Sequence, residues 1–395
     1  MSFSGMVKEE LSRHIGSGRH CRIAELAAIF TFCGSLEAGT DGKKSLRIQT
    51  ENEALSRKGF TLLQKTFNIE TDVSNSRIDC FRKGNLYCIS IIDQVLVKEI
   101  LDFLDIQPGQ TGFDATLGYG GHTKAMLECL KGQGHIYATD VDPEESAKTK
   151  KRLEEQGFGE EILTVCLQNF CTIDEIAEKV GGFDFILVDL GVSSMQIDNP
   201  KRGFSFKADG PLDLRLNQEK GISAAERLDT ISREELAGML YENSDEPYCE
   251  ELAKAITDEI RRGNRIDTTT KLRNVIEKTL SFLPDNQEKK DIVKKTCQRT
   301  FQALRIDVNN EFEVLYEFME KLPDALRPGG RVAILTFHSG EDKLVKKALK
   351  AGYKAGIYSD YAKDVIRPSA QECAKNGRAR STKMRWAVRA EEQTD

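Results

Sequence analysis

The sequence of 395 residues lacks the features that mark several protein classes. Its ten cysteines include no Cys-x-x-Cys pair, and the nearest two, Cys166 and Cys171, have no second pair with which to complete a zinc site. No apolar run approaches the roughly 20 residues that span a bilayer. Met1 to Arg13 mixes acidic and basic side chains, unlike a secretory signal. We therefore expect a cytoplasmic protein with reduced thiols, no metal site and no membrane contact.

The sequence also lacks an overall positive charge, since its formal net charge is -6. Basic residues are nevertheless concentrated between Cys373 and Arg389, a segment without any acid. Such a segment can neutralise the phosphates of a nucleic acid. A solvated basic surface has the same composition, so both interpretations stay open. The residues concerned are Lys375, Arg378, Arg380, Lys383, Arg385 and Arg389.

The most informative segment that is present reads Asp-Ala-Thr-Leu-Gly-Tyr-Gly-Gly-His over residues 114–122. Strand-like residues precede it and a helix-like run follows it, so the predicted order is strand, glycine-rich turn, helix. Glycines at such a turn let the backbone approach a ligand closely. The next predicted strand ends at Asp140, whose carboxylate can accept hydrogen bonds from ribose hydroxyls. This pair predicts a nucleoside-bearing cofactor on a doubly wound sheet, whereas the glycines alone would also fit a simple tight turn.

A second polar segment, Asp189 to Gln196, follows an apolar run typical of a buried parallel strand. Ligands of open α/β sheets bind beyond the carboxyl ends of the strands. We therefore expect Asp189, Ser193, Ser194 and Gln196 to face the same crevice as the glycine-rich turn and Asp140. The alternative is a loop whose Ser and Asp side chains cap a helix.

The order of predicted elements indicates three parts. Residues 1–91 fit a small α+β domain. Helical patterns fall on residues 9–14, 22–32 and 52–67, and strand patterns on residues 45–50, 77–82 and 85–92, the last two forming a hairpin. Strand patterns then occur up to about residue 190 and return at Arg331 to Phe337, with only helical patterns from about 213 to 303. We therefore predict an α/β domain formed by residues 92–210 and 304–395, with a helical domain, residues 211–303, inserted into it.

Further polar residues stand in segments that otherwise look like core. Aromatic side chains there can stack on a base, and arginines can hold phosphates. The competing interpretation is that the phenylalanine belongs to the core, the arginines form ion pairs and the histidine is satisfied within a loop. The candidates are Arg202, Phe204, Arg215, Arg305, Asn309 and His338.

Six motifs in the same order resemble the bacterial small-subunit ribosomal RNA cytosine N4-methyltransferase family, known as RsmH or MraW. The likeness runs from about residue 93 to 390. The motifs are Asp-Ala-Thr-Leu-Gly-x-Gly-Gly-His, Asp-Leu-Gly-Val-Ser-Ser-x-Gln, Arg-Gly-Phe-Ser-Phe, Gly-Pro-Leu-Asp-x-Arg, Phe-Gln-Ala-Leu-Arg-Ile-x-Val-Asn and Phe-His-Ser. The resemblance implies a Rossmann-like class I methyltransferase fold with an inserted helical domain. It also implies S-adenosylmethionine-dependent methylation of the exocyclic N4 of cytosine 1402 in 16S rRNA of the small ribosomal subunit.

The resemblance further implies the residues of the site. Its cofactor contacts fall on Gly120, Gly121 and His122 at the turn, Asp140 at the ribose, Phe170 near the adenine, and Asp189 and Gln196 after the fourth strand. The substrate would be contacted by the six candidates named above. The Asp/Asn-Pro-Pro-aromatic motif of many amino-methyltransferases is absent. Our hypothesis for the catalytic acceptor of a hydrogen bond from the cytosine amine is Asp189 or a nearby backbone carbonyl.

Two departures from the family pattern affect the substrate side. The family's Phe-His-Ser-Leu-Glu-Asp-Arg is Phe-His-Ser-Gly-Glu-Asp-Lys over residues 337–343, and its Tyr-Gly-Glu-Glu run is replaced from Tyr241 onward. A methyltransferase retargeted to another RNA therefore stays an alternative. Another is a nucleic-acid-binding regulator that keeps the fold without activity, whereas the incomplete glycine fingerprint disfavours a nicotinamide dehydrogenase. A homodimer is compatible with the resemblance.

The first 90 residues resemble a different family, the N-terminal domain of the sporulation regulator WhiA, which is related to homing endonucleases. The resemblance rests on Ser2-Phe3-Ser4, on the run from Val7 to Arg13, on Cys21 to Ala27 and on Thr50-Glu51-Asn52. We find no complete pair of nuclease carboxylates and expect no cleavage activity. The segment either assists nucleic-acid binding or serves as a scaffold.

Overall fold

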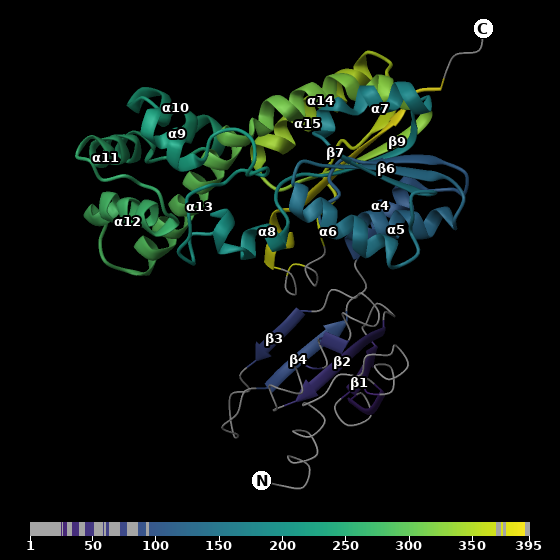
Figure 1. Ribbon diagram of the computed structural model, residues 1–395, viewed down its shortest axis with the longest axis horizontal. Helices are drawn as coiled ribbons and strands as arrows, with labels where there is room; N and C mark the ends of the chain where they lie inside the picture. The colour runs from purple at the N-terminus through teal and green to yellow at the C-terminus, as the bar shows by residue number, and fades with distance from the viewer. Residues whose placement is uncertain are drawn as a thin grey trace. The chain divides into compact units, whose positions relative to one another are not determined.

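A computed structural model describes residues 95–368 and 377–391 continuously (Figure 1). It also describes residues 25, 27–29, 34–38, 44–50, 58, 61–62, 72–76, 86–91 and 373. The chain forms two compact units. The first comprises residues 1–95 and 369–380, and the second comprises residues 96–368 and 381–395.

The described strands of the first unit form an antiparallel sheet in the order β1-β2-β4-β3. The predicted strand at Ser45 to Thr50 is confirmed as β2, whereas β1 was not predicted. The second strand of the predicted hairpin agrees with β4, which pairs with β2 and β3, and residues 77–82, predicted as the first strand, lie outside the described residues. The predicted helix at residues 9–14 also lies outside them. The strands are β1 (Gly34–Ala38), β2 (Lys44–Thr50), β3 (Asp72–Ser76) and β4 (Leu86–Ile91).

The second unit contains a seven-stranded sheet in the order β10-β11-β9-β8-β5-β6-β7. The pairs among β7, β6, β5, β8 and β9 are parallel, while β11 runs antiparallel to both β9 and β10. Strand order reverses between β5 and β8, where doubly wound sheets bind their ligands. The predicted Rossmann-like class is confirmed. The strands are β5 (Thr111–Asp114), β6 (His135–Asp140), β7 (Leu163–Leu167), β8 (Phe183–Asp189), β9 (Leu326–Thr336), β10 (Tyr358–Tyr361) and β11 (Lys383–Arg389).

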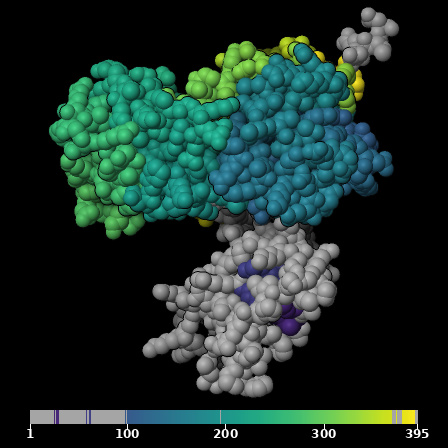
Figure 2. Space-filling model, viewed as in Figure 1, coloured from purple at the N-terminus to yellow at the C-terminus, as the bar shows by residue number. Residues whose placement is uncertain are grey.

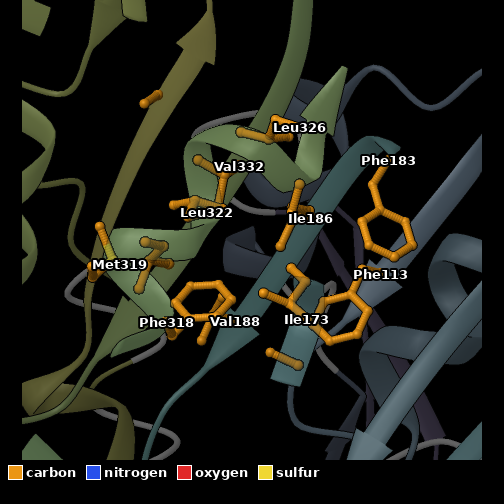
Figure 3. Packing of buried hydrophobic residues seen from close by; sticks show 14 of the residues in the cluster. Phe113, Ile173, Phe183, Ile186, Val188, Phe318, Met319, Leu322, Leu326 and Val332 are labelled. Carbon is orange, nitrogen blue, oxygen red and sulfur yellow. The ribbon is translucent and has the colours of Figure 1, made fainter. Parts of the chain in front are cut away.

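Alternating residues of the central strands bury opposite faces of this sheet. Ile186 and Val188 of β8 pack against α7, α14 and α15, as Figure 3 shows, whereas Phe185 and Leu187 pack against α4, α5 and α6. Both faces are therefore covered, which explains the continuous apolar run of β8. The covering helices are α4 (Val95–Leu104), α5 (Gly121–Leu130), α6 (Pro143–Glu154), α7 (Ile173–Val180), α14 (Glu311–Ala325) and α15 (Ser339–Lys354).

Five helices after the short α8 (Ser194–Asp198) form a block with a hydrophobic core of its own, here called the helical block. In Figure 2 it forms a teal-to-green lobe beside the α/β part of the same unit. The predicted end of this part at residue 303 falls inside α13, which continues to Asn309. The helices are α9 (Ala224–Thr230), α10 (Arg233–Ser244), α11 (Cys249–Arg261), α12 (Thr269–Thr279) and α13 (Gln287–Asn309).

The C-terminal basic segment contains a strand that the sequence pattern did not reveal. Its residues 383–389 form β11, and Lys383 and Arg385 both bind Asp342, Lys383 at 3.3 Å and Arg385 at 2.6 Å. These two side chains thus share one carboxylate of the protein, and Arg385 makes the shorter contact. Within the described ranges, no helix has the length and apolar character needed to cross a membrane.

Candidate functional site

The glycine-rich turn connects β5 to α5 at the point where the strand order reverses. Gly120 has a φ of 76°, and a Cβ there would stand 2.7 Å from the Thr149 side chain. This position therefore requires glycine for both backbone conformation and space. Gly121 differs, because a Cβ there would meet no atom within 4 Å, so the first turn of α5 has an open approach.

Asp140 joins this turn to the end of β6. Its Oδ2 accepts a hydrogen bond from the Gly118 N–H at 2.8 Å, and its Oδ1 accepts one from the Asp142 N–H at 2.9 Å. Burial raises the pKa of Asp140, although these hydrogen bonds favour the ionised form. The carboxyl expected at a ribose is therefore held in place by backbone donors on both sides.

Asp189 stands at the end of β8, next to the same turn. Its N–H donates to Thr116 Oγ1 at 2.9 Å, and its Oδ2 lies 3.5 Å from His122 Nε2. The side chain is 31% exposed, but its Oδ1 is buried without a hydrogen-bond partner within the described parts of the chain. Burial, reinforced by the charge of Glu341, raises the pKa of Asp189 to about 7. The structure thus brings His122 and Asp189 together, as expected, and leaves one carboxyl oxygen of Asp189 without a partner.

His338 and Glu341 lie where the chain passes from β9 into α15. His338 caps α15, its Nδ1 accepting from the Glu341 N–H at 3.4 Å. Glu341 Oε2 accepts from the Phe337 N–H at 2.8 Å, and its Oε1 lies 3.1 Å from His338 Nε2. Burial would raise the pKa of Glu341, but His338 and the backbone donors outweigh it and hold that pKa below its ordinary value. The sequence analysis missed Glu341, although the spacing His-x-x-Glu is that of a capping box.

Glu311, His338 and Glu341 have side chains of the kind that bind metals, and their ligand atoms lie within 4.8 Å of one another. Arg305, however, binds both carboxylate oxygens of Glu311, at 2.7 and 2.8 Å. The guanidinium therefore already supplies the positive charge that these carboxylates require. We interpret the cluster as an ion-pair network that links α13 to α14.

Arg202 and Gln196 meet at a buried carboxylate. Gln196 Nε2 donates to Asp142 Oδ2 at 2.9 Å, and Arg202 Nη1 donates to the same oxygen. All three residues are buried. Gln196 was expected beside the cofactor and Arg202 beside the RNA, yet in the structure both face Asp142.

The remaining candidates on the substrate side also have partners within the protein. Arg215 binds Asp213 through two hydrogen bonds of 2.8 and 2.7 Å. Asn309 Oδ1 accepts from the Leu216 N–H at 2.7 Å. Phe204 is partly buried against the core of the helical block. Of the two interpretations weighed for these residues, ion pairing and core packing describe the contacts observed.

Phe170 follows β7 in a short 3-10 helix (Phe170–Thr172). Its ring packs edge-on against Phe318, with the ring centroids 5.3 Å apart. The side chain is partly buried, so the contact with Phe318 fixes its ring at this end of the sheet.

Two family models match the chain. The MraW methylase family matches residues 92–390, and the WhiA N-terminal LAGLIDADG-like domain matches residues 19–107. Both resemblances inferred from the sequence are therefore confirmed. The two matches share residues 92–107, which include α4.

Relatives with curated names cover the same part of the chain. A ribosomal RNA small subunit methyltransferase H 1 of Agathobacter rectalis is 86% identical over 297 residues, which is 75% of this chain and 85% of that protein. The protein of the same name from Lachnoclostridium phytofermentans is 70% identical over 75% of this chain and 81% of its own. A ribosomal RNA small subunit methyltransferase H of Koribacter versatilis is 39% identical over 75% of this chain and 93% of its own.

Solved structures are much more distant. An S-adenosylmethionine-dependent O-methyltransferase from Thermotoga maritima is 10% identical with a TM-score of 0.35, over 92% of this chain and 95% of that chain. A likeness of this size says nothing about the chemistry of the site. The match over residues 92–390 and the identity to curated relatives are sufficient: the chain belongs to the MraW methylase family.

Proposed function

We propose that this protein is an rRNA methyltransferase that transfers a methyl group from S-adenosylmethionine to the exocyclic N4 of a cytosine in 16S rRNA, cytosine 1402 at the decoding site. Membership of the MraW methylase family and the names of the relatives support the reaction class and the RNA. The observation that carries the chemistry is the Asp189 carboxyl, which has a free oxygen at the end of β8.

The strand ends at the glycine-rich turn fit the proposed cofactor. S-adenosylmethionine supplies a methyl group already activated on a sulfonium. The open approach at Gly121 can admit its amino-acid part, and the Asp140 carboxyl can accept from its ribose hydroxyls. The Asp189 carboxylate would add a negative charge to the same crevice, which suits a cationic cofactor. We assign Phe170, His122 and Gln196 to the surroundings of this site, with Gln196 acting through Asp142.

Asp189 acts on the amine that receives the methyl group. A cytosine amine is a poor nucleophile, because its lone pair is delocalised into the ring. An acceptor on one N–H localises that pair, and the same acceptor takes the proton that N4 must lose. The protein must also hold N4 within about 3–3.5 Å of the methyl carbon and in line with the bond that breaks.

The helical block provides the RNA-facing part of this proposal. It stands beside the carboxyl ends of β8 and β9, and Ser339 Oγ of α15 lies 3.5 Å from Asp245 Oδ2 after α10. A base brought to Asp189 therefore has to enter next to this block. We assign the block to substrate recognition, with the buried arginines acting inside the protein and exposed residues meeting the RNA.

The test is methyl transfer from radiolabelled S-adenosylmethionine to small ribosomal subunits that lack the N4 mark, followed by mapping of the labelled nucleotide. Label on cytosine 1402 supports the full proposal. Intact cofactor binding with label elsewhere, or with none, indicates an enzyme retargeted to another RNA. Loss of cofactor binding altogether would favour the nucleic-acid-binding regulator and contradict the proposal.

A further inference from the structure

A buried ion pair between Asp142 and Arg202 connects the loop after β6 to the segment that leads into the helical block. Asp142 caps α6, with one oxygen accepting from the backbone of Glu144 and Glu145. Its other oxygen accepts from Gln196 and Arg202. The side chains of Asp142 and Arg202 are only 2% and 4% exposed, so this pair is shielded from water.

The other terminal nitrogen of the Arg202 guanidinium, Nη2, binds the segment of residues 214–216, which leads into the helical block. Nη2 donates to the carbonyl oxygens of Leu216 at 2.7 Å and Arg215 at 3.1 Å. Asn309, at the end of α13, binds the same segment, because its Nδ2 donates to the Leu214 carbonyl at 2.8 Å. The segment is therefore fixed from two sides, by Arg202 from the α/β part and by Asn309 from the helical block.

The backbone of this segment needs such support. Leu214 is buried and has a φ of 64°, a conformation that costs a non-glycine residue free energy. Its N–H donates to the Arg202 carbonyl at 3.1 Å, and its own carbonyl accepts from Asn309. Strained residues persist where their surroundings determine the backbone, and here Arg202 and Asn309 do so.

Asp142, the second member of the ion pair, contacts the proposed cofactor site. The Asp142 N–H donates to Asp140 Oδ1, so a shift of Asp142 moves the carboxyl assigned to the ribose. Burial would raise the pKa of Asp142, but the hydrogen bonds from Arg202 and Gln196 outweigh it and lower that pKa. Without Arg202 the buried carboxylate would lose its charge partner, which is costly.

We propose that Arg202 is a positioning residue that holds the Asp140 loop and the helical block in one fixed relation. It does so through Asp142 on one side and Arg215–Leu216 on the other. This inference rests on the proposed function, because its expected effect is a change in cofactor affinity. Arg202 would set that affinity without contacting the cofactor or the RNA. Gln196 and Asn309 belong to the same chain of contacts.

The test compares Arg202→Lys and Arg202→Met with a matched pair, Arg227→Lys and Arg227→Met. Arg227 of α9 also forms an ion pair, with Asp307 at 2.8 Å, and is 22% exposed against 4% for Arg202, but it does not bind Asp142. The Kd for S-adenosylhomocysteine is measured by calorimetry, together with kcat and the KM for small ribosomal subunits. We expect Arg202→Lys to weaken cofactor binding about tenfold and Arg227→Lys to change it less than twofold.

A double-mutant cycle sharpens the test. Asp142→Asn and Arg202→Met should each weaken S-adenosylhomocysteine binding, and the double variant should lose little more than either one, because both remove the same contact. If Arg202→Met fails to fold, Arg202→Lys and Asn309→Ala carry the comparison.

Two results would overturn the inference. Unchanged cofactor affinity with a raised KM for subunits would make Arg202 an RNA contact, and unchanged values of both would remove any positioning role. The proposed function fails separately, in a wild-type protein that binds the cofactor but labels no subunit. The affinity comparison stays valid in that case.

Discussion

Two regions contain charged side chains: the strand ends around Asp189, and the region of Arg202, Arg215 and Arg305, here called the junction. They differ in whether those charged groups have partners within the protein. At the strand ends, Asp189 keeps an oxygen without a partner, among the residues described, and Gly121 has open space before it. At the junction, Arg202, Arg215 and Arg305 are each bound to a carboxylate of the protein. The Asp189 carboxyl therefore keeps an acceptor for a ligand, whereas the charges of the three arginines are already paired within the protein, although Arg202 Nε has no hydrogen-bond partner in the described parts of the chain.

The largest effect should come from removing the free acceptor. Asp189→Ala should lower kcat by about 10²–10⁴-fold, because the positioned acceptor for the amine proton is lost. Cofactor binding by calorimetry serves as the control for an intact site. A variant that binds cofactor and methylates normally would show that Asp189 has no role in the mechanism. The free oxygen of Asp189 would then not distinguish a ligand-binding group from the paired residues of the junction.

A stability effect of comparable size is expected at the junction. Arg305→Met leaves Glu311 without its bidentate partner, next to Glu341, and should lower the free energy of unfolding by about 3 kcal/mol. Urea denaturation measures it. The double variant Arg305→Met/Glu311→Leu should recover part of the loss. Full stability of the single variant would show that this pair does not hold the fold.

The pH dependence of activity should report Asp189. Its role requires the carboxylate, and its pKa is raised to about 7, so kcat/KM should fall about tenfold per pH unit below that value and level off above it. The measurement is kcat/KM for S-adenosylmethionine between pH 5.5 and about 8.5. A flat profile across neutral pH would mean that another group accepts the proton.

The two glycines of the turn should differ although they are neighbours. Gly120→Ala introduces strain at a positive φ and a clash with Thr149, and should lower stability by about 1–2 kcal/mol. Gly121→Ala should leave stability nearly unchanged but weaken cofactor binding, since the methyl group fills the open approach. Melting temperature and calorimetry separate the two. Equal effects of both on stability would mean that Gly121 is also structural.

The smallest effect should be a gain in stability. A carboxyl whose pKa is raised on folding binds more protons in the native state, so stability falls as pH rises from about 4 to about 7. Asp189→Asn removes that cost and should raise the melting temperature at pH 8, by roughly 2–4 °C for each kcal/mol gained. A lower melting temperature would show that the carboxylate stabilises the fold instead.

The strands, turn and helix that carry the candidate site could be predicted because their signals are local. The order strand, glycine-rich turn, helix lies within 20 residues, and Asp140 and Asp189 each end an apolar run. The partners of the junction lie far apart in sequence instead: Arg202 and Asp142 are separated by 60 residues, and Asn309 and Leu216 by 93. No local pattern distinguishes an arginine that will meet such a partner from one that will meet a phosphate.

The strand β11 was missed for the same reason. Lys383 and Arg385 made residues 383–389 resemble a solvated basic segment, and the carboxylate that both of them bind, Asp342, lies about 40 residues earlier. Met384 and Ala387 are buried, but the basic residues that alternate with apolar ones at the start of the segment hid this strand pattern. Asp342 of α15 is the partner that allows these basic residues to lie in a strand of the sheet, and a local pattern does not reveal it.

The place of β11 in the sheet has a consequence for synthesis on the ribosome. It lies between β9 and β10, yet it follows both in the chain. Until residues 383–389 have left the exit tunnel, β9 presents an unpaired edge and β10 has no strand to join. Exposed edges of this kind invite pairing with other chains. The methyltransferase sheet therefore closes only after β11 has been synthesised, and a nascent chain stalled before Lys383 would be prone to aggregate.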